Sequence, residues 1–193
     1  MEDSDKEIKQ GLDCYDPESR VFPEIRKRLS KAEGLTKRDV LLILKWKLGR
    51  IKGSNAKTVS DENLKKINKA IVDAKKPEKA VAALKSLDKI PGIGVATATA
   101  ILTVCFPDTF TIIDERVLES LELFPRWYEK KKKQKEKYST ADWTAKGYVQ
   151  EYLPRVREYK DRWNKALREV DQVLWGLSVN RRVEKVIKKS EES

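Results

Sequence analysis

Residues 87–102, LDKIPGIGVATATAIL, contain the turn that decides the fold. Hydrophobic residues at helical spacing stand on both sides of the short run Pro91 to Gly94. Glycine lacks a Cβ, so this turn can follow a backbone path that other residues obstruct, and it can approach a ligand closely. The stretch therefore predicts two helices joined by a tight hairpin over residues 88–97.

The predicted helix that begins at Val95 gives the hairpin a chemical property. Amides in the first turn of a helix lack partners within the helix, and the helix dipole strengthens their attraction for anions. We expect them to hold a phosphate oxygen without selecting a base sequence. Glycine turns also join helices in many proteins, and polar side chains near such a turn are often only solvated. The candidate contacts are Lys89, Pro91, Gly92, Ile93, Gly94, Val95 and Thr97.

Helical patterns extend along most of the remaining chain. Thr36 and Ser60 are predicted helix N-caps, and Pro77 is predicted to open a further helix. Residues 95–106 are apolar or small almost all round, as in a helix enclosed by others. Alternating β-branched runs are nearly absent. We therefore expect an all-α protein, a helical bundle that could form two small lobes with a cleft.

Two amphipathic faces are expected to build the core. The helix after Thr36 is predicted to bury Val40, Leu41, Leu44, Leu48 and Ile51, with stops at Gly49 and Gly53. The last helix, predicted over residues 155–177, is expected to place Trp163, Leu167, Val170, Leu174 and Leu177 on one face.

Composition and charge suggest three segments. Residues 1–19 are interpreted as a polar arm, residues 20–179 as the helical domain, and residues 180–193 as a charged tail that frays. Within the domain, residues 129–140, EKKKKQKEKYST, have no apolar face. They are predicted to form an exposed basic loop, with a flap over a DNA backbone as the alternative.

The charge balance points to a polyanionic partner. Lys and Arg number 42 against 31 Asp and Glu, which gives a net charge of +11. Such an excess favours nucleic acid through counterion release, although the charges could also only solvate the surface. The hydrophobic fraction of 39% is high enough for a folded core.

Several classes of site are excluded by residue content. The chain has no histidine and only two cysteines, too few for an iron–sulfur cluster and without a zinc spacing. We expect no metal and no organic cofactor. No apolar run is long enough to span a membrane, and the charged start does not resemble a signal peptide. An intracellular monomer is expected, in the cytoplasm or nucleoid, or in a nucleus, with no membrane partner.

Downstream of the hairpin, residues 106–121, FPDTFTIIDERVLESL, place Asp114 after a short extended passage and before another helix. An aspartate there can cap the helix, or can stabilise positive charge that develops in a reaction. The two roles are compatible, because capping would hold the carboxylate in place. Arg116 is interpreted as a phosphate contact or as the partner of a nearby acid.

The hairpin followed by this aspartate resembles the helix-hairpin-helix DNA glycosylase superfamily, which includes endonuclease III and the alkylbase and 8-oxoguanine glycosylases. The likeness covers about Leu84 to Leu123. It implies an enzyme that flips a damaged or modified base out of duplex DNA and hydrolyses its N-glycosidic bond with Asp114. Because the cluster cysteines of endonuclease III are missing, the alkylbase and oxidised-purine branches are closer matches.

One position argues against lyase chemistry. Lyase members of the superfamily carry a lysine two residues after the final hairpin glycine, where this chain has Ala96. The resemblance therefore implies a monofunctional glycosylase. Lys47, at the edge of an apolar helix face, is the alternative nucleophile, although a lysine there is more simply solvated at its tip. Candidates for stacking or contacting a flipped base are Trp46, Arg50 and Trp175.

Two other functions fit the same sequence. A non-enzymatic helix-hairpin-helix module would explain the charge and the hairpin, but it has little need for an acid near phosphates. A helical protein-interaction domain would make the hairpin only a turn, and it would not show salt-sensitive DNA binding.

Overall fold

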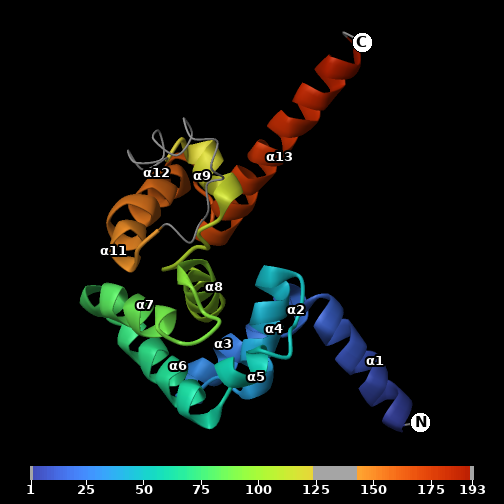
Figure 1. Cartoon of the computed structure of the whole chain (residues 1–193), viewed down its shortest axis with the longest axis vertical. Coiled ribbons are helices and arrows are strands. Elements are labelled where there is room, and N and C mark those ends of the chain that lie inside the picture. The colour runs from blue at the N-terminus through green and yellow to red at the C-terminus, as the bar shows by residue number, and fades with distance from the viewer. Residues whose placement is uncertain (1, 124–142, 192–193) are drawn as a thin grey trace. The chain divides into compact units, whose positions relative to one another are not determined.

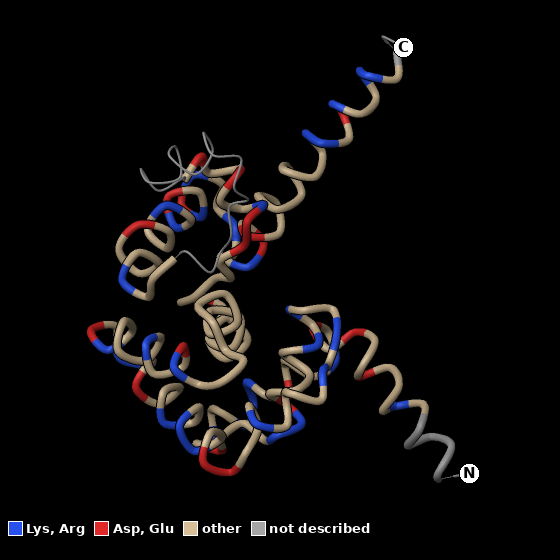
Figure 2. Tube along the Cα trace, viewed as in Figure 1, with Lys and Arg blue, Asp and Glu red and all other residues tan. Residues whose placement is uncertain are grey.

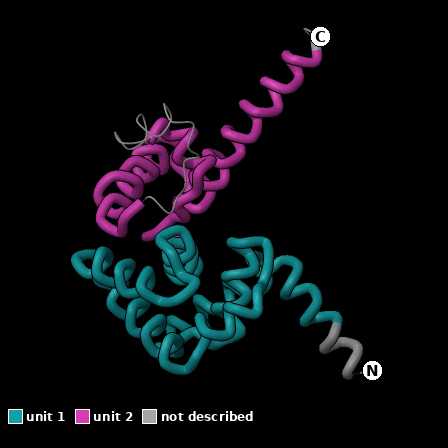
Figure 3. The backbone as a smooth tube through the Cα atoms, in the orientation of Figure 1, with its two compact units in different colours: residues 1–106 teal, residues 107–193 magenta. Residues whose placement is uncertain are grey.

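The computed structural model describes residues 2–123 and 143–191, and this part of the chain is helical, without strands. The prediction of an all-α protein is confirmed. The chain forms two compact units, unit 1 (Met1–Phe106) and unit 2 (Pro107–Ser193) (Figures 1 and 3). Their boundary falls inside the helical domain predicted over residues 20–179. The basic loop predicted over residues 129–140 lies outside the described residues.

Unit 1 is a succession of short helices ending in the hairpin and α8. They are α1 (Glu2–Tyr15), α2 (Pro17–Arg20), α3 (Phe22–Ser30), α4 (Lys37–Leu48), α5 (Asn55–Thr58), α6 (Asp61–Ala74), the 3₁₀ turn η1 (Pro77–Lys79), α7 (Ala80–Asp88) and α8 (Val95–Cys105).

Their limits follow the local signals. Thr36 caps α4 in a capping box with Asp39, the hydroxyl of Ser60 caps α6, and Gly49 ends α4 with φ 71°.

Helix α8 is the centre of unit 1. It packs against α3, α4, α6 and α7, and every residue from Thr97 to Cys105 is buried. Figure 2 shows that it carries no charged residue. Its threonines fit this setting because Thr99 and Thr103 donate their hydroxyl hydrogens to carbonyls one turn back, Ala96 and Thr99. The predicted central helix is confirmed.

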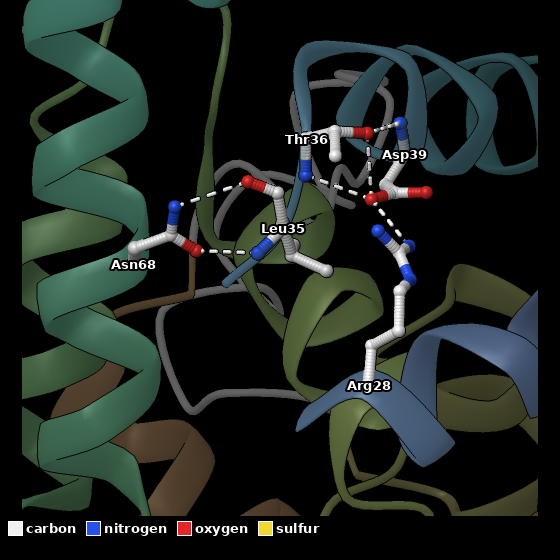
Figure 4. Close-up of polar contacts among 5 residues, drawn as sticks. All are labelled: Arg28, Leu35, Thr36, Asp39 and Asn68. Atoms are coloured by element: carbon white, nitrogen blue, oxygen red, sulfur yellow. Dashed lines mark hydrogen bonds and ion pairs between the residues drawn. The ribbon is translucent and has the colours of Figure 1, made fainter. Parts of the chain in front are cut away.

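Two polar residues hold the loop before α4 in place (Figure 4). Asn68 of α6 accepts from the Leu35 amide at 2.7 Å and donates to the Leu35 carbonyl at 3.1 Å. The Asp39 carboxylate accepts from the amide and hydroxyl of Thr36 and from Arg28, each at 2.7 Å. Because Asp39 is buried, these bonds replace the water that its charge would otherwise need.

Unit 2 packs its helices against a buried extended passage. Its described elements are α9 (Glu115–Leu121), α11 (Ala145–Gly147), the π-helical turn η3 (Tyr148–Tyr152), α12 (Leu153–Trp163) and α13 (Leu167–Glu191). Helix α13 packs on α9 and α12. Phe110, Ile112 and Ile113 of the passage are at most 5% exposed, so the passage is part of the core.

Three predicted features of the helices were wrong. Helix α4 buries Val40, Leu42, Ile43 and Leu44, while Leu48 is 48% exposed and Ile51, beyond the helix end, is 54% exposed. The predicted face continued past Gly49, whose left-handed conformation changes the direction of the chain. The single helix predicted over 155–177 is two helices, because Asn164 takes φ 50° after Trp163. Leu177, predicted to share the core-forming face of that helix, is 45% exposed.

The chain ends are also more helical than predicted. Residues 2–15 form α1 rather than an irregular arm, and its Ile8, Leu12 and Tyr15 follow helical spacing but stay exposed. Helix α13 continues to Glu191 instead of fraying after Val179, since Arg, Lys and Glu favour a helix without tertiary packing.

Candidate DNA interface and catalytic carboxylate

The hairpin is a tight turn anchored by two isoleucines. The Ile93 amide donates to the Ile90 carbonyl at 2.9 Å, and both side chains are 3% exposed. Pro91, Gly92 and Gly94 lie at the surface between and beyond these anchors. Gly92 has φ 82°, a conformation that side chains other than glycine rarely adopt. The hairpin therefore exposes backbone on a rigid support.

Thr58 supports the hairpin through a hydrogen bond, and the sequence did not predict this role. Its hydroxyl donates to the Pro91 carbonyl at 2.8 Å, and Thr58 is 1% exposed. A Cβ at Gly92 would lie 2.7 Å from the same hydroxyl oxygen, closer than real Cβ atoms come. No local pattern identifies Thr58, because its partner is 33 residues away.

Gly94 begins α8 in an extended conformation and has no side chain to cap it. The backbone amides of the first turn, Val95 to Thr97, therefore have no side-chain acceptor at the N-cap, as expected of an anion site. Thr97 is 5% exposed, which leaves little surface for the predicted hydroxyl contact, whereas Lys89 is exposed. Of the predicted contacts of the hairpin, Lys89, Pro91, Gly92 and Gly94 are exposed, whereas Ile93, Val95 and Thr97 are buried.

Asp114 occupies the N-cap of α9 in unit 2. One carboxylate oxygen, Oδ1, accepts from the Arg116 amide at 3.0 Å, and the residue is half-buried. The backbone of Asp114 is extended, with φ −140° and ψ 143°. The cap therefore restrains the carboxylate at a fixed place.

Two buried tyrosines fix the passage that leads to Asp114. The Tyr148 hydroxyl accepts from the Thr111 amide at 3.1 Å and donates to the Thr111 carbonyl at 2.5 Å. The Tyr152 hydroxyl donates to the Ile112 carbonyl at 2.6 Å. We call residues 110–113 the strap. Since Tyr148 and Tyr152 follow the strap by 37 and 40 residues, no local pattern predicted these bonds.

The same tyrosines remain protonated. Burial raises the pKa of Tyr152 well above its ordinary value, and the negative charges of Asp171 and Asp114 raise it further. Burial likewise raises the pKa of Tyr148. Their hydroxyls therefore act as permanent hydrogen-bond donors to the strap across the physiological pH range.

Arg116 and Trp175 form a pair that the sequence did not reveal. The guanidinium carbon lies 5.2 Å from the ring centroid of Trp175, within cation–π range, and Trp175 is 45% exposed. The sequence predicts separate roles for them, Arg116 as a phosphate contact or the partner of a nearby acid and Trp175 as a base-pocket residue. Both belong to unit 2, as does Asp114.

The remaining predicted site residues lie in unit 1. Trp46 packs edge-on against Phe22 with ring centroids 5.0 Å apart, and Lys47 is half-buried next to it in α4. Arg50 is exposed just after the helix.

The described part of the chain has neither a candidate metal site nor a membrane-spanning helix. No group of three acidic or cysteine side chains there is arranged to hold a metal ion, and no helix is long and apolar enough to cross a membrane. Cys105 is buried in α8, and this burial raises the pKa of its thiol to about 12. A thiol with that pKa is not a nucleophile at neutral pH.

No protein-family model, curated protein or solved structure matches this chain.

Proposed function

We propose that the protein is a DNA glycosylase that removes a damaged or modified base from duplex DNA. The observation that carries the proposal is the restrained carboxylate of Asp114, which caps α9 at the end of a strap held by Tyr148 and Tyr152. A group that must stabilise charge in a transition state gains from such preorganisation.

Asp114 would act on the sugar of a flipped nucleotide. As the bond from C1′ to the base breaks, its electrons leave with the base, and the sugar acquires oxocarbenium character. The negative carboxylate stabilises that charge and orients a water molecule for attack on C1′. The water oxygen forms the new bond to C1′, and the proton that it passes to Asp114 is balanced by the proton that the departing base takes up. The products are a free base and an abasic site.

Unit 1 would bind the DNA backbone. The turn at Gly92 presents backbone at the surface, and the start of α8 lacks a side-chain cap. Amides of this kind bind phosphate independently of the base sequence. A glycosylase needs such binding, since it must scan duplex DNA before it extrudes one base.

The chemistry proposed is hydrolysis rather than lyase cleavage. The position after the hairpin where lyases place their nucleophile is Ala96, which has no reactive group. Lys47 remains the alternative nucleophile.

A non-enzymatic DNA-binding module is the second candidate. The bond from the Arg116 amide to Asp114 favours it, because capping alone is a sufficient structural role for this carboxylate. Under this reading the hairpin binds DNA, and Asp114 only starts a helix.

Base release from a panel of duplexes with alkylated, deaminated, oxidised and modified bases separates the two candidates. The wild-type protein is compared with Asp114→Asn and with Asp108→Asn, a matched change at an exposed aspartate of the same passage. The glycosylase proposal expects release that Asp114→Asn lowers by at least about 100-fold and Asp108→Asn leaves intact. Strand scission without alkali would indicate a lysine nucleophile. DNA binding without release from any duplex would establish the non-enzymatic module.

A further inference from the structure

A hollow of about 340 Å³ lies beside the hairpin in unit 1. Residues of α6 form one side, and residues from α7 to the hairpin form the other. Pro91 belongs to the hairpin and also lines the hollow, so the two surfaces adjoin. Its lining residues are Asn63, Lys66, Lys69, Ala70, Asp73, Ser86, Lys89, Ile90 and Pro91.

The helical repeat explains why polar side chains gather here. Asn63, Lys66, Ala70 and Asp73 recur three or four residues apart, so they share one face of α6. That face adjoins α7, against which α6 packs. Lys69 borders the same face, and Lys89 follows the end of α7. Three lysines from two segments thus line one hollow.

Most other polar groups of the lining are already engaged. The Ser86 hydroxyl donates to the Ala82 carbonyl at 2.9 Å, and the side-chain amide of Asn63 donates to the Lys57 carbonyl at 2.8 Å. The Asp73 carboxylate is 3.4 Å from the Lys79 ammonium.

Among the lysines, Lys66 pairs with Glu62 at 2.5 Å. Neither Lys69 nor Lys89 forms an ion pair with any described residue. Both ammonium groups are therefore left without a carboxylate partner among the described residues, and both are available to an anion that enters the hollow.

We infer that this hollow binds a second phosphate of the DNA strand held by the hairpin, with Lys69 and Lys89 as its donors. The inference rests on the DNA binding proposed above and adds a contact from α6, outside the helix-hairpin-helix itself. Two phosphate contacts on adjoining surfaces fix the direction of the strand, whereas a single contact leaves it free to turn. Lys69 is the decisive residue, because the hairpin alone would account for Lys89.

The test measures binding of a fluorescein-labelled, undamaged duplex by anisotropy over a salt series. Wild type is compared with Lys69→Gln, Lys89→Gln and the double variant, and Lys31→Gln, at an exposed position that does not line the hollow, is the charge-matched control. Because both target lysines are exposed, the variants should keep the wild-type melting temperature.

Each single substitution is expected to reduce the slope of log K against log salt by about 0.9, and the double by about twice that. The loss of affinity between 50 and 200 mM salt then becomes roughly 3.5-fold smaller for each lysine removed. Duplexes of different sequence should respond alike. A Lys69→Gln slope equal to that of wild type and Lys31→Gln overturns the inference.

Two further measurements distinguish a DNA phosphate from free phosphate as the ligand of the hollow, and distinguish this inference from the glycosylase proposal. Inorganic phosphate, added at constant ionic strength, should displace DNA from wild type more readily than from the double variant. Phosphate binding that depends on these lysines, together with unchanged DNA slopes, would mean that the hollow takes free phosphate, which overturns the assignment to DNA. Lysine-dependent slopes without base release support this inference while the glycosylase proposal fails.

Discussion

The hairpin of unit 1 and the strap of unit 2 reach a defined geometry by opposite routes. The hairpin is fixed mainly by its own residues, through the turn at Gly92 and the anchors Ile90 and Ile93, with one distant support from Thr58. The strap has no regular structure of its own and depends on tyrosines 37 and 40 residues later in the chain. Local interactions thus position the backbone of the hairpin, and long-range hydrogen bonds position the strap that leads to the Asp114 carboxylate.

The difference suits the two proposed roles. Phosphate binding needs several amides that point outward together, which a short turn before a helix provides. A catalytic carboxylate must be held against a defined point on a substrate, which calls for restraint from more than one direction. Asp114 receives this restraint from the cap of α9 and from the strap before it.

The largest effect is expected from removing one strap hydroxyl. Tyr148→Phe leaves the amide and the carbonyl of Thr111 unpaired in the interior of unit 2. It should lower the free energy of unfolding by about 2–4 kcal/mol, since each unpaired buried group costs about 1–3 kcal/mol. Urea denaturation measures the loss. Tyr159→Phe, the same change on half-buried Tyr159 of α12, is the control and should cost less than about 0.5 kcal/mol. Equal effects in both variants would show that the strap does not depend on Tyr148.

The corresponding change in the hairpin should be smaller. Gly92→Ala places a Cβ 2.7 Å from the Thr58 hydroxyl at φ 82°, and we expect a loss of about 1–3 kcal/mol with weaker DNA binding. Gly94→Ala is the matched control, because Gly94 has φ −96° and open space around its Cβ direction. Because Gly94 is the N-cap of α8, where alanine is less favourable than glycine, the unfolding free energy of Gly94→Ala should fall by less than about 1 kcal/mol. A harmless Gly92→Ala would contradict the rigid turn described here.

The contrast also explains what the sequence could predict. Features that depend on residues within a few positions of one another were all predicted. They are the helix caps at Thr36 and Ser60, the hairpin, and the place of Asp114 at the start of a helix. The supports from Thr58, Tyr148 and Tyr152 join distant segments, and a single sequence carries no signal for such pairs. Predicted helix limits were wrong where a left-handed residue turned the chain, at Gly49 and at Asn164.

A gain in stability is expected at the strap. The Thr111 hydroxyl oxygen is buried and has no hydrogen-bond partner in the described part of the protein. Thr111→Val replaces it with a methyl group of similar shape and keeps both backbone bonds to Tyr148. The free energy of unfolding should rise by about 1 kcal/mol, because an unsatisfied polar group no longer has to be desolvated. Thr109→Val, a half-buried threonine just before the strap, is the control and should change little. A loss of stability on Thr111→Val would mean that the hydroxyl has a partner such as an ordered water.

The smallest effect concerns the link between α9 and α13, and it should disappear in acid. The hydroxyl of buried Ser178 donates to the Glu119 carboxylate, and Arg182 lies 3.0 Å from it, so the pKa of Glu119 is lowered from its ordinary value of 4.5. A carboxyl whose pKa is lower in the folded protein adds stability above pH 4.5 and loses that contribution as the pH falls through the folded value. Glu119→Gln should therefore destabilise the protein at pH 7, and the difference from wild type should shrink below pH 4.5. Urea denaturation at both pH values measures it, with exposed Glu184→Gln of α13 as the control. A difference that stays constant with pH would show that shape, rather than charge, makes Glu119 useful at this contact.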